Sequence, residues 1–233
     1  MVNGSGEAII NNLKPGTYKA TISYPGDETY SASTAESNSF TVTAKPVATS
    51  ITAKAVSTVY NGGKYIVAVL KDKNGKALSG LTVQIKINGK TKTLKTDKNG
   101  QVKLTTNGLV PKTYTAAISF SGNNNYLKSS KSVKVTVKKA NPKLTAKAKT
   151  FKLKVKVKKY TATLKTNQNK VMKNTKVTLK VNKKTFSAKT NKKGIATFKI
   201  TNLKKKGTFN AVVKYMGSKY YKPKLKTTKI TVR

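Results

Sequence analysis

The chain of 233 residues contains 49 Lys and Arg against only six Asp and Glu, which gives a formal net charge of +43. Because Cys, His and Trp are absent, disulfides and thiolate metal sites are excluded, and acid–base catalysis would depend on a few carboxylates, Lys and Tyr. No apolar run approaches the roughly 18 residues of a transmembrane helix, and Met1 is not followed by the basic and apolar regions of a secretory signal peptide.

One short pattern recurs along the chain. In Tyr18–Tyr24 an aromatic residue, Ala, an aliphatic residue and a second aromatic residue occupy alternate positions, and the pattern returns in Tyr114–Phe120 and Phe209–Tyr215, about 95 residues apart. A period of two is typical of a half-buried strand. The recurrence predicts an all-β chain of tandem immunoglobulin-like β-sandwich modules, each of about 95 residues.

Residues 1–45 contain the signals of only part of such a module. We expect a strand around Ala8–Ile10, a corner at Leu13–Tyr18 and a closing strand at Phe40–Val42. This segment is interpreted as the C-terminal half of a truncated module, in a chain that begins inside a longer array; a genuine N-terminal extension is the alternative. An isolated hairpin is marginally stable, so the segment should lean on its neighbour or fray. Asn3-Gly-Ser5 matches a glycosylation sequon, a match expected by chance in a chain rich in Asn, Ser and Thr.

Residues 46–139 contain the signals of a complete module. Short apolar-polar alternations are separated by turns such as Asn88-Gly89, a strong hairpin signal because both residue types tolerate positive φ. Seven short strands with frequent turns are typical of a sandwich or a barrel. They are predicted at Ile51–Ala55, Tyr65–Lys71, Leu81–Ile87, Lys90–Thr96, Gln101–Thr106, Tyr114–Phe120 and Val133–Val137.

Residues 140–233 repeat this plan as a second complete and highly basic module. Lys152–Lys158 alternates strictly between Lys and Leu or Val, which predicts a strand with Lys on one face and Leu153, Val155 and Val157 on the other. Further strands are predicted at Thr175–Val181, Thr185–Thr190, Ile195–Ile200, Phe209–Tyr215 and Lys226–Val232.

Charge rises steeply along the chain. The net charge is −1 for residues 1–45, +15 for 46–139 and +29 for 140–233, the last of which contains no acid. Solubility requires only about 2–8 charges on a small domain. Part of the lysine pattern is explained by a solvated sheet face that deters edge pairing; the excess indicates attachment to a polyanion. The candidate contacts are Lys152, Lys154, Lys156, Lys158, Lys204, Lys205 and Lys206.

Several motifs carry a family resemblance. They are Leu13-x-Pro-Gly-Thr-Tyr18 with its counterpart at Leu109–Tyr114, Gly122-Asn-x-x-Tyr126, Thr96-Asp-x-Asn-Gly100 and the closing Val133–Val137. Together they resemble the immunoglobulin-like repeat domains of bacterial and archaeal surface proteins, and in particular the adhesin-like proteins of methanogenic archaea. This resemblance implies an extracellular array that acts as a stalk, an adhesin or a wall-associated protein.

The resemblance also implies local features. Tyr18 and Tyr114 are placed as in a tyrosine corner, whose phenol bonds nearby backbone, whereas Phe209 has no hydroxyl. Lys–Asn isopeptide cross-links of surface sandwiches need a buried acid. We expect none in residues 140–233, and the turn positions of Asp72 and Asp97 argue against one in 46–139.

The chemistry of the chain favours a diffuse anionic partner. Asp72 and Asp97 are predicted to cap turns rather than to bind metal or act in catalysis, so we predict no enzyme activity, cofactor, metal or small-molecule substrate. The basic residues are almost all Lys, which lacks the planar guanidinium group that Arg uses to recognise base edges. This composition favours cell-wall or acidic glycan polymers, or an anionic lipid surface, over nucleic acid. Two alternatives stay open: a basic nucleic-acid-binding protein and a passive spacer whose charge has no ligand.

Overall fold

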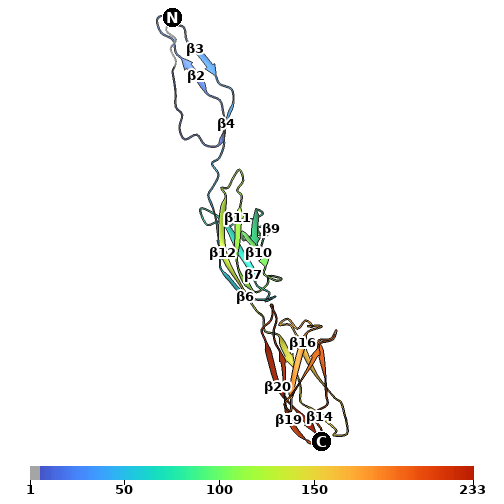
Figure 1. The fold of residues 1–233 in the computed structure, drawn as a ribbon. Helices are drawn as coiled ribbons and strands as arrows, with labels where there is room; N and C mark the ends of the chain where they lie inside the picture. The colour runs from blue at the N-terminus through green and yellow to red at the C-terminus, as the bar shows by residue number, and fades with distance from the viewer. Residues whose placement is uncertain (1–5) are drawn as a thin grey trace.

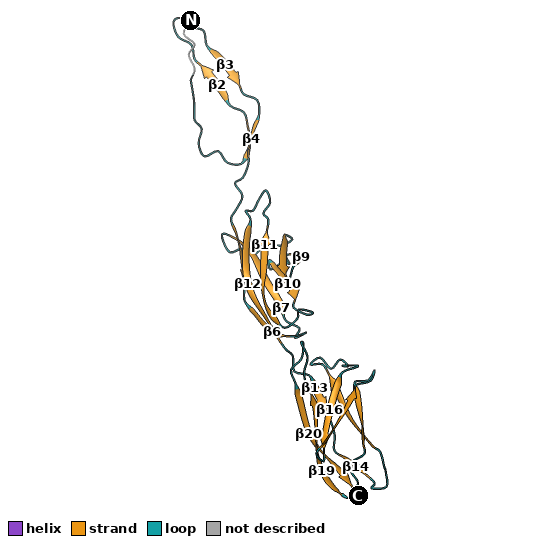
Figure 2. Cartoon of the chain, in the orientation of Figure 1, coloured by secondary structure: helices purple, strands orange, loops and turns teal. Residues whose placement is uncertain are grey.

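The computed structural model describes residues 6–233, which form twenty β-strands and no helix (Figures 1 and 2). An N-terminal segment and two β-sandwiches follow one another in an elongated arrangement (Figure 1). The predicted all-β sandwich fold is thus confirmed. No helix that could cross a membrane occurs within 6–233. The sequon at Asn3 and Ser5 lies outside the described residues.

The N-terminal segment, residues 6–42, consists of two separate two-stranded ribbons. The recurring strand is split at Lys19 and Ala20, and the expected strand at Ala8–Ile10 is not formed. No second sheet covers the ribbons, and Ile22 is 73% exposed where its counterpart Ile118 is 1% exposed. The strands are β1 (Gly16–Tyr18), β2 (Thr21–Tyr24), β3 (Ser33–Glu36) and β4 (Phe40–Val42), with β1 paired to β4 and β2 to β3.

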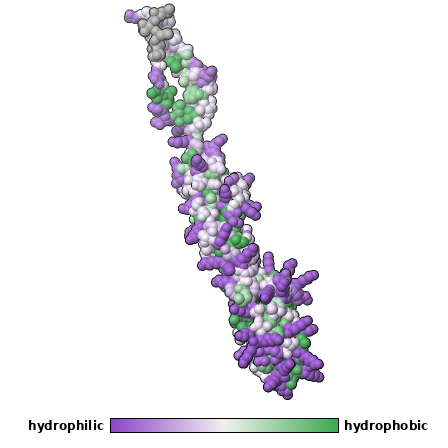
Figure 3. All heavy atoms as spheres, in the orientation of Figure 1, coloured by the Kyte–Doolittle hydropathy of each residue, from purple (hydrophilic) through white to green (hydrophobic). Residues whose placement is uncertain are grey.

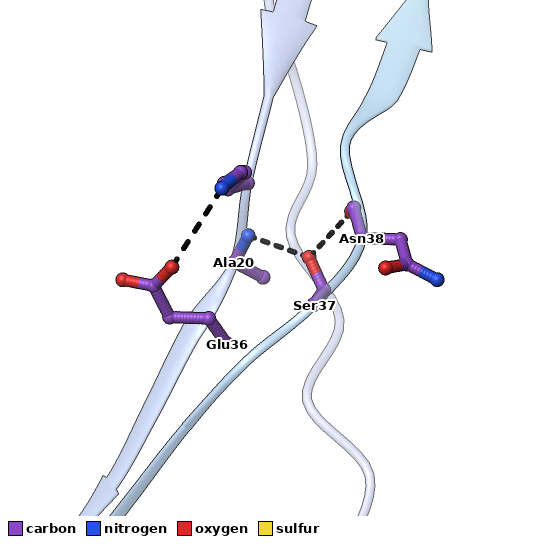
Figure 4. Close-up of polar contacts among 5 residues, drawn as sticks. Ala20, Glu36, Ser37 and Asn38 are labelled. Atoms are coloured by element: carbon purple, nitrogen blue, oxygen red, sulfur yellow. Dashed lines mark hydrogen bonds and ion pairs between the residues drawn. The ribbon is translucent and has the colours of Figure 1, made fainter.

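Polar contacts hold the segment together at the split. The N–H of Ala20 donates to Oγ of Ser37 (2.9 Å), and that hydroxyl donates to the carbonyl of Asn38 (2.9 Å; Figure 4). Lys19 and Glu36 form an ion pair of 3.9 Å beside them. Such exposed contacts contribute little stability, typically 0–1 kcal/mol for the ion pair. The segment's large apolar side chains, such as Ile22 and Tyr30, are exposed, and the expectation that it leans on its neighbour or frays stays a prediction.

The first sandwich, residues 49–138, is built from two facing sheets. Three strands form one sheet in the order β10-β7-β5, and five form the other in the order β6-β12-β11-β8-β9. Tyr114, Ala116, Ile118 and Phe120 of the recurring pattern are all buried between the sheets. The strands are β5 (Thr49–Ala53), β6 (Val56–Val59), β7 (Tyr65–Asp72), β8 (Thr82–Ile87), β9 (Lys90–Lys95), β10 (Gln101–Thr105), β11 (Lys112–Phe120) and β12 (Ser129–Lys138).

The second sandwich, residues 143–232, repeats this topology. Its sheets have the orders β13-β15-β18 and β14-β20-β19-β16-β17, and its core contains Ala211, which is 0% exposed. The strands are β13 (Lys143–Thr145), β14 (Lys149–Phe151), β15 (Lys158–Lys165), β16 (Lys176–Val181), β17 (Lys184–Lys189), β18 (Ile195–Ile200), β19 (Gly207–Tyr215) and β20 (Lys224–Val232).

The predicted strand at Lys152–Lys158 is wrong. Residues 152–157 form a loop, which joins β14 in one sheet to β15 in the other. β14 pairs in parallel with β20 as far as Phe151 opposite Val232, and one further bond joins the N–H of Leu153 to the carbonyl of Arg233. The N–H of Val155 then turns back to the carbonyl of Lys152 (3.2 Å), so the segment folds into a turn. Alternation alone does not form a strand where no ladder is available.

Turns in the two sandwiches use the same geometry with different side chains. Oδ1 of Asp72 accepts the N–H groups of Asn74 and Lys76, both at 2.9 Å. At the equivalent turn of the second sandwich, the hydroxyl of Thr166 accepts two backbone N–H groups instead. Asp97 is likewise replaced by Asn191, whose Oδ1 accepts two N–H groups. The turn roles predicted for the two aspartates are confirmed, and the second sandwich forms these turns without acids.

The predicted tyrosine corners are also confirmed. The hydroxyl of Tyr18 donates to the carbonyl of Lys14 (2.7 Å), and that of Tyr114 donates to the carbonyl of Val110 (2.8 Å). Both bonds anchor the chain just before the recurring strand. Phe209, which lacks a hydroxyl, leaves the second sandwich without this contact at the same position.

A compact joint connects the two sandwiches. Ala140, between them, exchanges backbone bonds with the 220–222 stretch: its N–H donates to the carbonyl of Tyr220 (3.0 Å) and its carbonyl accepts the N–H of Lys222 (2.9 Å). Tyr60 of the first sandwich stacks on Tyr220 with ring centroids 4.6 Å apart and meets Tyr221 edge-on at 5.7 Å. The joint is therefore held by paired backbone and by aromatic contact.

Candidate polyanion-binding surface

Two lysine-rich loops lie at the same end of the second sandwich. One, residues 152–157, precedes β15, and the other, residues 201–206, follows β18. They meet because Lys158 pairs with Ile200 in one sheet while Gly207 pairs with Val232 in the other. A backbone bond from the N–H of Leu153 to the carbonyl of Arg233 (2.8 Å) ties the first loop to the last strand.

The hairpin between β16 and β17 adds two more lysines, Lys183 and Lys184, to this end of the sandwich. The side-chain N–H₂ of Asn202 donates to the carbonyls of Val181 (3.2 Å) and Asn182 (3.1 Å), which holds the hairpin tip against the 201–206 loop. We call the resulting cationic surface the basic end. Its members, all exposed, are Lys152, Lys154, Lys156, Lys183, Lys184, Lys204, Lys205, Lys206 and Arg233.

Lys158 does not belong to this surface, contrary to the sequence-based prediction. Its side chain is buried, with the residue 2% exposed, and its ammonium group donates to the carbonyl oxygens of Val155 (2.6 Å) and Leu153 (3.5 Å). A buried charge needs such hydrogen-bonding partners to offset its lost hydration. Lys158 therefore stabilises the loop that presents its neighbours and is not accessible to a polymer.

Apolar side chains lie between the cations of the same loop. Leu153, Val155 and Val157 are 38%, 39% and 43% exposed. They were predicted to lie on the face of a strand opposite the lysines, but the loop leaves each of them partly in solvent. The basic end is therefore amphipathic, and a polymer that touches it meets both ammonium groups and hydrocarbon.

No internal counter-charge neutralises the basic end. Residues 140–233 contain no Asp or Glu, and Lys19–Glu36, in the N-terminal segment, is the ion pair that the structure forms within residues 6–233. Figure 3 shows the hydrophilic side chains radiating from the second sandwich. Exposed charges interact over a Debye length of about 8 Å at physiological ionic strength, so neighbouring ammonium groups in these loops repel one another and attract anions together.

The cations of the basic end are suited to nonspecific attraction of anionic groups rather than to recognition of particular bases. Eight of the nine cations of the basic end are lysines, each a hydrated ammonium on a flexible stem, and only Arg233 carries a planar guanidinium. Aromatic side chains near lysines are few: the ammonium of Lys184 lies 5.8 Å from the ring of Phe186, and that of Lys149 lies 5.1 Å from the ring of Phe151. This arrangement offers no aromatic platform of the kind that stacks bases.

Groups that would hold a metal are absent from the described part of the chain, where no three of Asp, Glu, His or Cys cluster. Asp97 directs one carboxylate oxygen to the amides of Asn99 and Gln101. Such a turn aspartate supplies far fewer than the six to eight oxygens that Ca²⁺ prefers.

Sequence reasoning found six of the nine members of the basic end. It missed Lys183, Lys184 and Arg233. The two lysines lie beside the 201–206 loop through the hydrogen bonds of Asn202, and Arg233 lies beside the 152–157 loop through its bond to Leu153. A usable signal was present: Asn182 stands 94 residues after Asn88, and both adopt the positive φ of a hairpin turn.

Comparison with protein families gives one match. The model of the SpaA prealbumin-like fold domain matches residues 63–152. The matched stretch begins just before β7 and ends just after β14, so it crosses from the first sandwich into the second. Curated proteins show no match to this chain.

Solved structures with a similar fold include bacterial adhesins and titin domains. A 1.5-MDa bacterial ice-binding adhesin matches with 13% identity over 93% of this chain and 75% of that chain, at a TM-score of 0.39. The bacterial integrin-binding protein invasin matches with 17% identity over 79% of this chain and 39% of that chain, at 0.46. A titin fragment matches with 9% identity over 77% and 63%, at 0.45. At these identities the likeness concerns the fold alone.

Proposed function

We propose that the chain is part of a non-enzymatic, adhesin-like or stalk protein of the cell surface, whose basic end associates with anionic wall or envelope polymers. The observation that carries this proposal is the gathering of nine exposed cations at one end of the second sandwich, whose sequence contains no carboxylate side chain. They lie on two loops, on the hairpin between β16 and β17, and at Arg233. Net charge of this size destabilises a compact fold by self-repulsion. An external polyanion relieves that cost.

The modular organisation supports the stalk role. We place the module boundaries at 45/46 and 139/140, with residues 1–45 as the C-terminal half of a further module. Its recurring strand has the same residue pattern as β11 and β19, but its apolar face is exposed. The elongated arrangement of Figure 1 suits a spacer that separates its two ends. We also propose an extracellular location. The sequence motifs that resemble those of methanogen surface proteins support it.

The rise in positive charge along the chain suggests an orientation of the protein relative to the cell. The most basic sandwich is C-terminal, and residues 1–45 carry a net charge of −1. We therefore propose that the second sandwich lies against the anionic wall or envelope of the cell that produces it, and that the N-terminal part points outward.

Binding of the full chain to a glycerol-phosphate wall polymer, measured across salt concentrations, tests the proposal. Lys204, Lys205 and Lys206 are changed to Gln together in one variant, and Lys173, Lys192 and Lys193, exposed in loops at the opposite end of the sandwich, are changed in a matched control. The dependence of log affinity on log salt has a slope of about 0.7 per neutralised phosphate on a single-stranded polymer. The first variant should flatten that slope by about 2 and weaken binding at least tenfold, and the control should stay within twofold.

Three outcomes oppose the proposal. Equal losses of affinity in both variants would mean that the polymer responds to the overall positive charge of the sandwich and has no preferred end. Equal or tighter binding to duplex DNA than to wall polymer at physiological salt would favour a nucleic-acid-binding protein. Absence of binding to any polyanion would favour a passive spacer.

A further inference from the structure

The outer face of β7 in the first sandwich is unexpectedly apolar. Alternate residues of this strand point into the core, among them the fully buried Ile66, so Tyr65, Val67 and Val69 point outward. Tyr65 is 53% exposed, and the two valines are partly exposed. The equivalent outward positions of β15 in the second sandwich are Lys159, Thr161 and Thr163. Those residues are the polar ones expected of a solvated face, which makes the apolar face specific to the first sandwich.

A groove runs along this face. It has a volume of about 470 Å³ and is bounded by β7 and by residues 52–57, where the chain leaves β5 and crosses to β6 in the other sheet. Ala53, Ala55 and Val56 line one side of it, and Lys54 and Lys64 are also among its lining residues. The equivalent hollow of the second sandwich is about 190 Å³. There, the hydroxyl of Tyr160 donates to the carbonyl of Lys147 (2.7 Å) and ties the crossing segment to the sheet.

The groove contains an unused strand edge. β7 pairs with β10 along Tyr65–Val69, but β5 pairs only with Ala68–Asp72, because β5 ends at Ala53. The carbonyl of Lys64 and the N–H of Leu70 bond on the β10 side. Since alternate residues of an antiparallel strand bond to opposite neighbours, the N–H and C=O groups of Tyr65 and Val67 point to the β5 side. In residues 6–233, no backbone bond joins those groups to the departing segment at Lys54.

We infer that this groove binds an extended, acidic peptide segment of another protein, which adds as a strand to the free edge of β7. Strand addition takes its affinity from main-chain hydrogen bonds and its selectivity from pockets for alternate side chains. Here the edge of Tyr65 and Val67 supplies the hydrogen bonds, and the apolar groove accepts small aliphatic side chains. The ammonium groups of Lys54 and Lys64 favour a carboxylate on the incoming strand. The inference is independent of the basic end, which belongs to the other sandwich.

The probe is a fluorescent peptide that alternates three valines with polar residues and carries one glutamate. Its binding to the full chain is followed by fluorescence anisotropy, and amide NMR shifts locate the contact. Two N-methylated forms of the probe each block the hydrogen bonds of one peptide edge, and a Gln form removes the carboxylate. The variant Tyr65→Lys, Val67→Thr, Val69→Thr installs residues that the second sandwich already has at these positions.

The probe should bind, with shifts centred on Tyr65–Val69, and one N-methylated form should lose at least tenfold in affinity. The triple variant should lose at least tenfold as well, and the Gln form about threefold. Equal binding of both N-methylated forms and the parent would overturn strand addition. Shifts confined to lysines of the second sandwich, with binding abolished by salt, would assign the peptide to the basic end. Absence of binding at millimolar probe would reject the groove as a peptide site.

Discussion

The aromatic contacts of the joint between the two sandwiches all involve Tyr60, and removal of its side chain should loosen the joint. Tyr60 contacts two rings of the second sandwich, Tyr220 by stacking and Tyr221 edge-on. Aromatic pairs contribute about 0.5–1.5 kcal/mol each beyond the area they bury, so Tyr60→Ala should cost about 1–3 kcal/mol of joint stability. Since 1.4 kcal/mol is tenfold in an equilibrium constant, the population of open joints should rise roughly 5- to 150-fold.

Distances between spin labels report the orientation of the sandwiches. The chain contains no Cys, so Lys134→Cys on β12 and Lys226→Cys on β20 give a clean pair of labelling sites. Pulsed electron paramagnetic resonance should show one narrow distribution of label-to-label distances in the parent chain and a broad one after Tyr60→Ala. Some coupling should persist, because Nε2 of Gln168 donates to the carbonyl of Asn61 (2.6 Å) and does not involve the Tyr60 side chain.

A matched control separates the joint from general destabilisation. Tyr65→Ala removes an exposed tyrosine of the same sandwich that makes no aromatic contact with Tyr220 or Tyr221, so the distribution should stay narrow. The reasoning would be refuted if the distance distribution of the parent chain were already as broad as that of the Tyr60→Ala variant. It would also be refuted if the distribution of the variant were as narrow as that of the parent.

Three further predictions concern the sandwiches themselves. Tyr114→Phe should lower the free energy of unfolding of the first sandwich by about 1 kcal/mol, because a corner carbonyl loses its partner, whereas Tyr18→Phe should have no measurable effect; denaturant titration compares them. Asp97→Ala should cost about 1 kcal/mol through two lost turn bonds, and Asp97→Asn should be nearly neutral, since Asn191 makes the same bonds. Burial raises the pKa of Tyr160 above its usual 10.0, so its stabilising effect is complete below pH 10 and is lost as pH rises through the folded-state pKa. Tyrosinate absorbance should show a late-ionising group that Tyr160→Phe removes.

The sequence predicted most strands of both sandwiches because their signals are local. Tyr114–Phe120 alternates cleanly and follows a corner, and the observed β11 runs from Lys112 to Phe120. β6 was missed because Val56–Val59 is short and pairs in parallel with β12, far along the chain. The same cause explains the wrong strand at Lys152–Lys158: its alternation is perfect, but whether a ladder is available beside it is a property of the whole fold.

The candidate site was predictable in part for a similar reason. Lys204, Lys205 and Lys206 form a run that no strand pattern requires, so their position on an exposed loop could be anticipated. Lys158 was assigned to the surface because charge normally stays in water; its burial depends on carbonyls of a loop whose shape the sequence did not reveal. The apolar run at Tyr65–Leu70 carried the signal of the groove, since a strand solvated on one face should not be apolar on both.

Turn chemistry is what lets the second sandwich carry so much charge without losing its fold. At Thr166 and Asn191, neutral oxygens accept the same backbone amides that Asp72 and Asp97 accept in the first sandwich. The turns are kept, and the carboxylates that would neutralise nearby lysines are gone. Two unit charges 10 Å apart in water repel by about 0.4 kcal/mol before screening, and many such pairs add up across the sandwich. That cost falls when salt or a polyanion screens it. The second sandwich should therefore gain more stability than the first from an anionic polymer, and equal gains in thermal unfolding would contradict this link between charge and partner.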